Sequence, residues 1–437
     1  MATENKKYIP ALRFPEFQND GEWILTPVGK YYKVQGGFAF RSSEFKKSGT
    51  PIIRISNIPN EGIYIDISNS VYYDRIENEV NFLISKGDLL IAMSGATTGK
   101  TAVYNQIGKA YLNQRVGLFK SINSHNYYPF ICQWVKSNYF YAQLKRTLAA
   151  GAQPNISSKD IESFIWAYPN GNNSFAEQKK IADCLSSLDK YIDATKRKLE
   201  LLKEHKKGLM QRLFPAKGKT TPELRFPEFQ DAGEWKNIKF SELFTFISNN
   251  TLSRASLNNN GGIVQNIHYG DVLIKYKENL SAITEEIPFI TDINDIQKYI
   301  SVKMENGDII IADTAEDEIV GKCTEIQDIT KEIIVAGLHT IAIRPNCKFA
   351  KYYLGFYLNS QSYRDQLTQY MQGVKVLAIS KTSIAQTRIC FPISLEEQEH
   401  IANCLMEINN SLKLIEEKIK VLELHKKGLM QQLFPKL

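Results

Sequence analysis

The chain has 437 residues, of which 43% are hydrophobic and 23% charged, so it is long enough for two or three folded domains, and disorder throughout is excluded. No apolar run approaches the roughly 20 residues of a membrane span, and the polar N-terminus lacks the pattern of a secretory signal. The net charge of +7 is too small to indicate nucleic acid by itself, and the six scattered cysteines favour reduced thiols in a cytoplasmic protein over a zinc site or a disulfide framework.

The first distinctive element of the sequence is a short segment that occurs twice. Residues 12–18, Leu-Arg-Phe-Pro-Glu-Phe-Gln, return unchanged as residues 224–230, and Gly21-Glu22-Trp23 returns as Gly233-Glu234-Trp235. Farther on, Glu177-Gln178 with Ile181-Ala182 and Cys184-Leu185 recurs as Glu397-Gln398, Ile401-Ala402 and Cys404-Leu405, and His-Lys-Lys-Gly-Leu-Met-Gln occurs at residues 205–211 and 425–431. A period above 200 residues is far too long for a solenoid, so the pattern indicates a duplicated, domain-sized unit.

Between these shared segments the two halves differ in sequence but have similar patterns. Short β-branched runs predict strands at residues 51–58, 88–93 and 102–104 in the first half and at 308–312, 333–335 and 340–343 in the second. Shorter helical stretches follow near residues 128–148 and 349–370. Each half is therefore predicted to hold a mixed α+β domain.

Each half closes with a long helix whose apolar residues alternate at spacings of four and three, which is typical of a coiled coil. Ser174 and Ser394 each precede a Glu by three residues and predict capping boxes, and the helices are expected to end near Phe214-Pro215 and Phe434-Pro435. The expected seam residues are Ile181, Leu185, Leu188, Ile192, Thr195, Leu199 and Leu202 in the first helix and Ile401, Leu405, Ile408, Leu412, Ile415, Ile419 and Leu422 in the second.

The connectivity of these elements predicts an architecture. A helix of about 39 residues rises roughly 58 Å, so the first one would carry the chain away from the first domain before the second domain begins. The second helix needs a long partner, so we expect it to run back antiparallel to the first. The predicted fold is α+β, with similar globular domains at residues 1–173 and 216–393 lying at opposite ends of a two-helix coiled-coil spacer, residues 174–215 and 394–437, in a pseudo-two-fold internal repeat.

The repeated segments resemble those of the specificity subunits of type I restriction–modification systems, over essentially the whole chain. The resemblance implies that each globular domain is a target recognition domain that reads one half of an asymmetric bipartite DNA target. The helices would set the spacing and dock two modification (methyltransferase) subunits, and restriction (translocase–nuclease) subunits would complete a complex for phage defence. It also implies that this chain is not catalytic, and that S-adenosylmethionine, ATP and magnesium bind to the partners.

The segment Ser94–Thr101 invites comparison with a phosphate-binding loop. The required spacing would place its first glycine at position 94, where Ser stands, and residues 102–104 read as a strand rather than a helix. A strand–loop–strand hairpin is expected instead, in which backbone amides, Thr98 and Lys100 meet a DNA phosphate; ordinary turn chemistry is the alternative. Gly321-Lys322 occupies the corresponding place, and Asp88 and Asp308 are expected to cap turns.

Base recognition requires Arg, Lys, Asn, Gln or His side chains held in a groove. Arg115 follows a predicted strand, and His339 falls at the matching place in the second domain. The alternative for each candidate is a solvated face or a local hydrogen bond, and for His339 a half-buried histidine. The DNA-binding candidates are Arg41, Arg54, Asn57, Thr98, Lys100, Asn113, Gln114, Arg115, Gln153 and Asn155 in the first domain and Arg254, Asn266, His268, Lys322, His339 and Lys375 in the second.

The charge distribution adds a prediction about affinity. Residues 1–174 carry 19 basic and 13 acidic groups (+6) and residues 175–219 carry 12 and 6 (+6), whereas residues 220–392 carry 17 and 21 (−4) and residues 393–437 carry 6 and 7 (−1). Phosphate neutralisation drives most DNA affinity, so the first domain and first helix should contribute most of its salt dependence. A solvated coiled-coil flank is the alternative for the helix.

Two other classes of function compete with this one. An autonomous methyltransferase would need a glycine-rich cofactor loop and an Asn/Asp-Pro-Pro-aromatic tetrad, neither of which occurs, and Glu228 with Glu234 and Lys236 only vaguely imitates a nuclease site. A coiled-coil DNA-binding scaffold or regulatory adaptor unrelated to restriction is the remaining alternative. Lys206 and Lys426 interrupt the apolar seam, which is consistent with either a helix end or a partner-docking site.

Overall fold

The strongest apolar runs of the sequence form the central strands β6 (Leu89–Ala92) and β17 (Ile309–Ala312), both buried on their two faces. Leu89 and Ile91 point to a core shared with helices, and the alternate residues Leu90 and Ala92 point to a core between sheets. In β17 the same alternation holds. A strand that is covered on both faces reads as a continuous apolar run because each face needs its own apolar residues.

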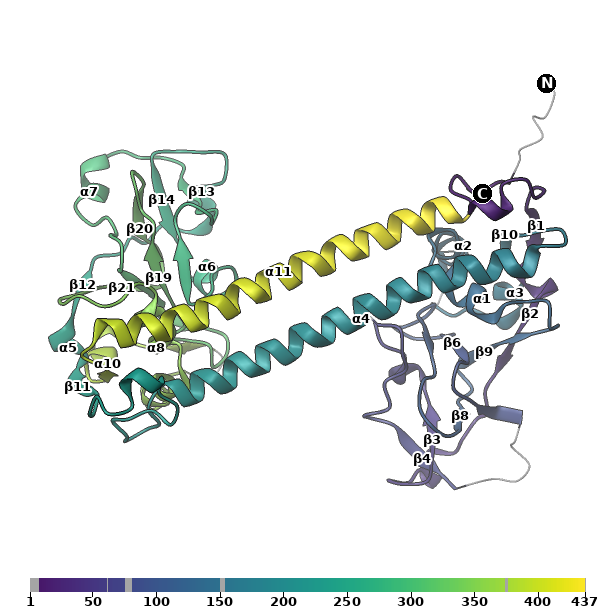
Figure 1. Cartoon of the computed structure of the whole chain (residues 1–437), viewed down its shortest axis with the longest axis horizontal. Helices are drawn as coiled ribbons and strands as arrows, with labels where there is room; N and C mark the ends of the chain where they lie inside the picture. Colours follow the sequence, from purple (N-terminus) through teal and green to yellow (C-terminus); the bar gives the residue numbers. More distant parts are fainter. Residues whose placement is uncertain (1–7, 61, 75–80, 150–153, 374–375, 437) are drawn as a thin grey trace. The chain divides into compact units, whose positions relative to one another are not determined.

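The computed structural model describes residues 8–60, 62–74, 81–149, 154–373 and 376–436. The chain divides into two compact units, residues 1–197 with 417–437 (unit 1) and residues 198–416 (unit 2), so each long helix is shared between them (Figure 1). Each unit combines a globular domain with one stretch of each long helix. The α+β class and the duplication predicted from the sequence are confirmed.

The globular domain of unit 1 holds two four-stranded sheets and one two-stranded ribbon. The first sheet is antiparallel, and the second contains one parallel pair, β3 with β8. The strand orders are β2 (Tyr32–Gly36), β9 (Val116–Ser121), β6, β7 (Thr101–Val103); β4 (Val71–Tyr73), β3 (Thr50–Ile53), β8 (Ala110–Leu112), β5 (Leu83–Ile84); and β1 (Ile24–Pro27), β10 (Ile165–Tyr168). The helices are α1 (Tyr128–Trp134), α2 (Asn138–Ala149) and α3 (Ser158–Ser163), and the 3-10 turns are η1 (Pro15–Phe17), η2 (Val28–Lys30), η3 (Ser42–Glu44) and η4 (Ile55–Asn57).

The globular domain of unit 2 repeats this plan with additions. Its strand orders are β12 (Phe244–Ile247), β21 (Thr340–Pro345), β17, β19 (Cys323–Gln327), β15 (Asn279–Ser281); β13 (Leu257–Asn258), β16 (Phe289–Ile290), β14 (Val264–Ile267), β20 (Ile333–Ala336); β11 (Lys236–Lys239), β23 (Arg388–Phe391); and β18 (Thr314–Ala315), β22 (Leu377–Ala378). The helices are α5 (Phe240–Leu243), α6 (Tyr269–Ile274), α7 (Ile296–Ile300), α8 (Tyr353–Leu358), α9 (Gln361–Thr368) and α10 (Lys381–Ala385), and the 3-10 turns are η6 (Pro227–Phe229) and η7 (Arg254–Ser256).

The two aspartates at the start of β6 and β17 cap turns, as predicted. The Asp88 carboxylate accepts the backbone N–H of Ser85 at 2.8 Å, and the Asp308 carboxylate accepts that of Glu305 at 2.6 Å. The Arg344 guanidinium also binds Asp308, at 2.7 Å, so this carboxylate is tied to β21 as well.

The long helices α4 (Ser174–Leu213) and α11 (Leu395–Leu433) have 40 and 39 residues, and both end where the sequence predicts. All of the expected seam residues are buried or partly buried. Ile181 and Leu185 pack into the core of domain 1, and Ile401 and Leu405 pack into that of domain 2. The first seam residues of each helix therefore anchor a globular domain rather than serving a partner helix alone.

Within unit 1 the two helix segments run antiparallel. Lys196 of α4 pairs with Glu423 of α11 at 2.5 Å, and farther toward the start of α4 Asp189 pairs with Lys426, which lies nearer the end of α11. Phe434, just after α11, packs edge-on against Trp23 with ring centroids 6.4 Å apart. The end of α11 thereby joins the core at the start of the chain.

The predicted capping boxes are corrected by the structure. Ser174 lies inside α4 and donates to the Pro169 carbonyl at 2.7 Å, whereas Ser394 does cap α11 by accepting the Glu397 N–H at 3.3 Å. Neither glutamate carboxylate reaches back to its serine. Arginines of the repeated opening segments bind them instead: Arg13 holds Glu177 through two bonds of 2.7 and 2.8 Å, and Arg225 holds Glu397 with the same distances.

All six cysteines are free thiols. Burial raises the pKa of five of them: Cys132 to about 12, Cys390 to about 11, Cys323 well above its usual value, and Cys347 and Cys404 by less. Across the described residues no helix is both long and apolar enough to cross a membrane.

Candidate nucleic-acid interface

The connection between β8 and β9 in domain 1 presents polar side chains from a rigid frame. The Asn113 N–H donates to the Ile53 carbonyl at 3.1 Å, and the Arg115 carbonyl accepts the Met93 N–H at 2.9 Å, so both ends of this three-residue turn are fixed to neighbouring strands. Gln114 and Arg115 are exposed, and Asn113 is partly buried. A fixed backbone with free Gln and Arg side chains suits base recognition, because both residue types can make paired hydrogen bonds to base edges.

The equivalent turn of domain 2 is held by the same two hydrogen bonds. The Gly337 N–H donates to the Ile267 carbonyl at 2.9 Å, and the His339 carbonyl accepts the Asp313 N–H at 3.1 Å. The predicted match of His339 with Arg115 is therefore confirmed. His339 has a φ of 54°, an unusual value for a residue with a side chain, and strained backbone of this kind concentrates at functional sites.

The structure brings other candidates of domain 2 close to His339. The Tyr269 ring contacts His339 edge-on at 5.3 Å and lies 4.6 Å from the His268 ring. The His268 Nδ1 accepts the Gly270 N–H at 3.2 Å, which assigns the ring proton of the neutral form to Nε2. Burial and the nearby Arg254 charge lower the pKa of His268, so the ring is neutral at physiological pH.

Two carboxylates restrain this cluster. Arg254 binds Asp271 at 2.7 Å, and His339 lies 3.3 Å from Asp313. His339 nevertheless keeps 47% of its side chain exposed, so it is only partly the half-buried histidine of the alternative interpretation. Asn266 is fully buried and accepts a hydrogen bond from Asn250 at 2.6 Å, so its side chain lies inside the domain and does not face solvent.

The hairpin of β6 and β7 in domain 1 is confirmed, and a strand follows its loop where a phosphate-binding loop would have a helix. Its loop is less suited to phosphate than predicted. The Thr98 hydroxyl donates to the carbonyls of Gly95 and Pro154, and the backbone N–H groups of residues 98–100 all bind carbonyls nearby. Phosphate requires free donors, and the Lys100 ammonium remains available for it, with one weak contact, 3.5 Å to the Asn60 carbonyl.

Two further candidates are engaged inside their domains. Asn57 is buried; its amide accepts the Arg54 N–H at 2.9 Å and donates to the Asp66 carbonyl, also at 2.9 Å. Lys322 is partly buried and donates to the Leu273 carbonyl at 2.7 Å, and burial lowers its pKa. These two side chains stabilise the fold and are not presented to a ligand.

The remaining candidates differ in their placement. Arg54 donates to the Asn69 carbonyl at 3.2 Å, and its buried Nε has no hydrogen-bond partner among the described residues. Arg41 has 81% of its side chain exposed and pairs loosely with Glu44 at 3.6 Å. Asn155 is exposed on a segment held near the hairpin by the Ile156 N–H, which donates to the Met93 carbonyl. Gln153 and Lys375 lie outside the described residues.

The repeated His-Lys-Lys-Gly-Leu-Met-Gln segments line two equivalent cavities, which the sequence did not predict. Lys426, Lys427, Met430 and Gln431 line a cavity of 230 Å³ in unit 1, and Lys206, Lys207, Met210 and Gln211 line one of 310 Å³ in unit 2. His205 and His425 are exposed, whereas Lys206 and Lys426 are partly buried and paired with carboxylates. These lysines interrupt the apolar seam because each binds an acid there.

The comparison with known families decides the identity of the fold. The sequence profile of the type I restriction modification DNA specificity domain matches twice, at residues 23–204 and 232–424, which together make up most of the chain. The chain belongs to this family. The two matches coincide with the two structural repeats, each running from a globular domain into its long helix.

Relatives in this family match the chain at full length. The specificity subunit of the type I restriction enzyme MjaVIII from Methanocaldococcus jannaschii is 23% identical over 98% of this chain and 95% of its own length. The crystal structure of a type I restriction–modification S subunit from M. genitalium covers 98% of this chain and 99% of its own, with 14% identity and a TM-score of 0.58. A chain from a structure titled for complex assembly and conformational transition of the type I R-M system covers 94% of this chain and 97% of its own, with 14% identity and a TM-score of 0.52.

Proposed function

We propose that this chain is the DNA sequence-specificity subunit of a type I restriction–modification complex. Each globular domain reads one half of a bipartite target, and the chain itself performs no catalysis. One observation carries the proposal: the two domains hold the same turn by the same backbone hydrogen bonds but present different side chains on it, Gln114 and Arg115 in one and Leu338 and His339 in the other. The same backbone turn with different side chains suits recognition of a target whose two half-sites differ in sequence.

Single-molecule methylation sequencing tests this function. DNA from cells that express the chain with its cognate modification subunit is compared with DNA from cells that lack the chain. The expected result is a new bipartite motif, methylated on both strands, with two different half-sites and dependent on this chain. A complex that assembles but leaves the methylation pattern unchanged would contradict sequence recognition by these domains.

The chain is further proposed to bind two modification subunits, one at each repeated His-Lys-Lys-Gly-Leu-Met-Gln segment, and restriction subunits through them. The two cavities lined by these segments support two equivalent docking positions. S-adenosylmethionine, ATP and magnesium would then be bound by the partner subunits.

Charge reversal on the exposed lysines of these segments tests the docking. Lys207→Glu with Lys427→Glu is expected to reduce co-purification of the modification subunit without changing the melting temperature, since both lysines are exposed. Lys198→Glu with Lys418→Glu changes two exposed helix lysines outside the motif and serves as the matched control. If the chain forms no complex at all with a cognate modification subunit, a DNA-binding scaffold unrelated to restriction becomes the better hypothesis.

A further inference from the structure

Each globular domain is fastened to its helix pair by a buried cluster of charges, and the two clusters are built differently. In unit 1 the Asp189 carboxylate of α4 binds Lys426 of α11 and also Lys136, which follows α1 of the globular domain, at 3.0 Å. Gln133 of α1 donates to the same carboxylate at 3.0 Å. The acid therefore comes from the helix, and the globular domain contributes a lysine.

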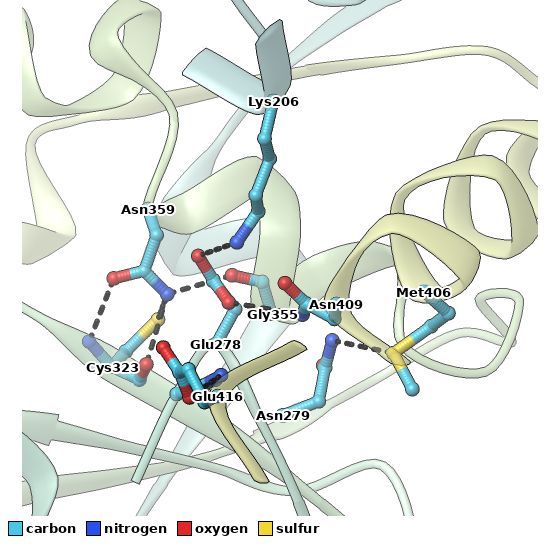
Figure 2. Close-up of polar contacts among 10 residues, drawn as sticks. Lys206, Glu278, Asn279, Cys323, Gly355, Asn359, Met406, Asn409 and Glu416 are labelled. Carbon is cyan, nitrogen blue, oxygen red and sulfur yellow. Dashed lines mark hydrogen bonds and ion pairs between the residues drawn. The ribbon is translucent and has the colours of Figure 1, made fainter. Parts of the chain in front are cut away.

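In unit 2 the acid comes from the opposite side. Glu278, just before β15 of the globular domain, pairs with Lys206 of α4, and Asn409 of α11 donates to the same carboxylate at 3.3 Å (Figure 2). The side chains of Lys206 and Glu278 are only 13% and 18% exposed, close to the 13% and 11% of Lys426 and Asp189. Both clusters are thus largely withdrawn from water, where an unpaired charge is costly.

The helix positions of the two clusters correspond residue by residue. Lys426 and Lys206 directly follow His425 and His205 and are the first lysines of the same repeated motif. Asp189 and Asn409 each lie four residues after a buried leucine that occupies the same repeat position, Leu185 and Leu405 respectively. The equivalent helix position therefore carries a carboxylate in one repeat and a neutral amide in the other.

The globular domains differ in the complementary way. In domain 1 the Val103 N–H donates to the Ile63 carbonyl, and in domain 2 the Glu325 N–H donates to the Glu278 carbonyl. These two hydrogen bonds are equivalent in the two domains, so domain 1 has Ile63 at the position where domain 2 has the acid Glu278. Ser137 and Ser360 follow α1 and α8 and accept equivalent capping bonds, so Asn359 stands in domain 2 where domain 1 has Lys136. The Asn359 amide is turned toward its own domain and binds the carbonyls of Cys323 and Gly355 (Figure 2).

We propose that these clusters are charge keys that assign each recognition domain to one of the two helix positions. Asp189 accepts a domain that brings a lysine, and Lys206 with the neutral Asn409 accepts a domain that brings an acid. Domain 2 placed at the first position would set Glu278 against Asp189, with Lys426 alone to balance two carboxylates. Domain 1 placed at the second position would set Lys136 against Lys206 with no acid. The proposal rests on the proposed function only in calling these domains recognition domains.

The decisive experiment applies one pair of helix substitutions to two full-length chains. The first chain has the native order, and in the second, residues 24–168 and 236–391 are exchanged, so that the repeated opening segments and both helices stay in place. Asp189→Asn together with Asn409→Asp transposes the helix keys. These substitutions are expected to lower the melting temperature of the native-order chain by roughly 5–10 °C and to raise that of the exchanged chain by a similar amount.

A purely structural role for Asp189 and Asn409 cannot reverse the sign of the effect. A shift in the same direction in both chains, or no shift in the native-order chain, would overturn the proposal. Glu200→Gln, at an exposed ion pair on α4, is the control and should leave both melting temperatures nearly unchanged.

A second measurement keeps the proposal testable if the exchanged chain does not fold. In the native order, Asn409→Asp and Glu278→Gln should each lower the melting temperature, the first by crowding two carboxylates on Lys206 and the second by removing its acid. The double variant should be more stable than either single variant, because Asp at position 409 then supplies the one carboxylate that Lys206 needs. Additive losses would overturn the proposal.

Melting and methylation separate this inference from the proposed function. If the chain directs methylation to a bipartite motif but its melting temperature does not respond to the substitutions as expected, only the charge-key proposal is refuted. If the melting temperatures shift as expected but the chain directs no methylation, only the proposed specificity function is refuted.

Discussion

At the scale of single residues, the exposed turn that carries Arg115 and His339 gives the most direct test of recognition. Arg115→Ala is expected to relax one half of the methylated motif and leave the other half unchanged, because the guanidinium is exposed on a fixed backbone while the rest of the domain is untouched. The loss at that half-site should be about 1–3 kcal/mol, as for one good base contact. Methylation sequencing of the variant measures it.

His339→Ala is the matched variant in the other domain. It should relax the opposite half-site, and because the His339 side chain is 47% exposed, its removal is expected to change the fold little. If Arg115→Ala instead abolished assembly with the modification subunit, or if both variants relaxed the same half-site, Arg115 would have a structural role.

A second prediction at this scale concerns Glu325, a fully buried carboxylate on β19. Burial raises its pKa to about 7, although the N–H groups of Tyr352 and Gly355 donate to it and partly oppose the rise. Between about pH 4.5 and pH 7 the folded chain keeps a proton that the unfolded chain releases, so stability falls as the pH rises through this window. The contribution is present in full below the window and lost above it.

Glu325→Gln removes this titration. As the pH rises from 4.5 to 8, the free energy of unfolding of the variant should increase relative to that of the native chain by up to about 3 kcal/mol. Chemical denaturation at a series of pH values measures the difference, and Glu316→Gln, at an exposed glutamate, controls for the change of formal charge. Parallel pH profiles for the native chain and Glu325→Gln would refute the raised pKa.

At the scale of elements, the repeated opening segments act as clamps on the long helices. Arg13 and Glu177 are separated by 164 residues, and their side chains are only 5% and 2% exposed. Both partners belong to repeated segments, and the sequence could have suggested their pairing on that ground.

Glu177→Gln should therefore lower the stability of the chain by about 3–5 kcal/mol, since it leaves the Arg13 charge buried without its partner. Combining it with Arg13→Met should recover much of the loss, because no charge then remains buried. Glu200→Gln, whose ion pair with Lys203 is exposed, should cost less than about 1 kcal/mol. Urea denaturation of the four chains provides the comparison, and a double variant as unstable as Glu177→Gln would argue against the clamp.

At the scale of the whole molecule, the uneven charge predicts unequal dependence on salt. Residues 1–174 carry a charge of +6 and residues 220–392 carry −4. In domain 2, two carboxylates, Asp271 and Asp313, also lie beside the candidate DNA-binding residues Arg254 and His339. Binding that depends on the first half-site should therefore weaken more steeply between about 50 and 200 mM salt than binding that depends on the second. DNA with one half-site scrambled at a time, titrated against the assembled complex, measures the two slopes, and equal slopes would contradict the prediction.

The sequence by itself determined the duplication, the α+β class and the two long helices with their ends, because these depend on patterns that are local or that repeat along the chain. It also placed Arg115 and His339 at matching positions. Only the tertiary structure decided which polar side chains remain available. Asn57, Thr98 and Lys322 carry suitable groups for DNA, but backbone carbonyls of other segments accept hydrogen bonds from them. The sequence alone did not predict the charge clusters of Asp189 and Glu278 either, because the partners of a buried ion are fixed by packing between segments far apart in the chain.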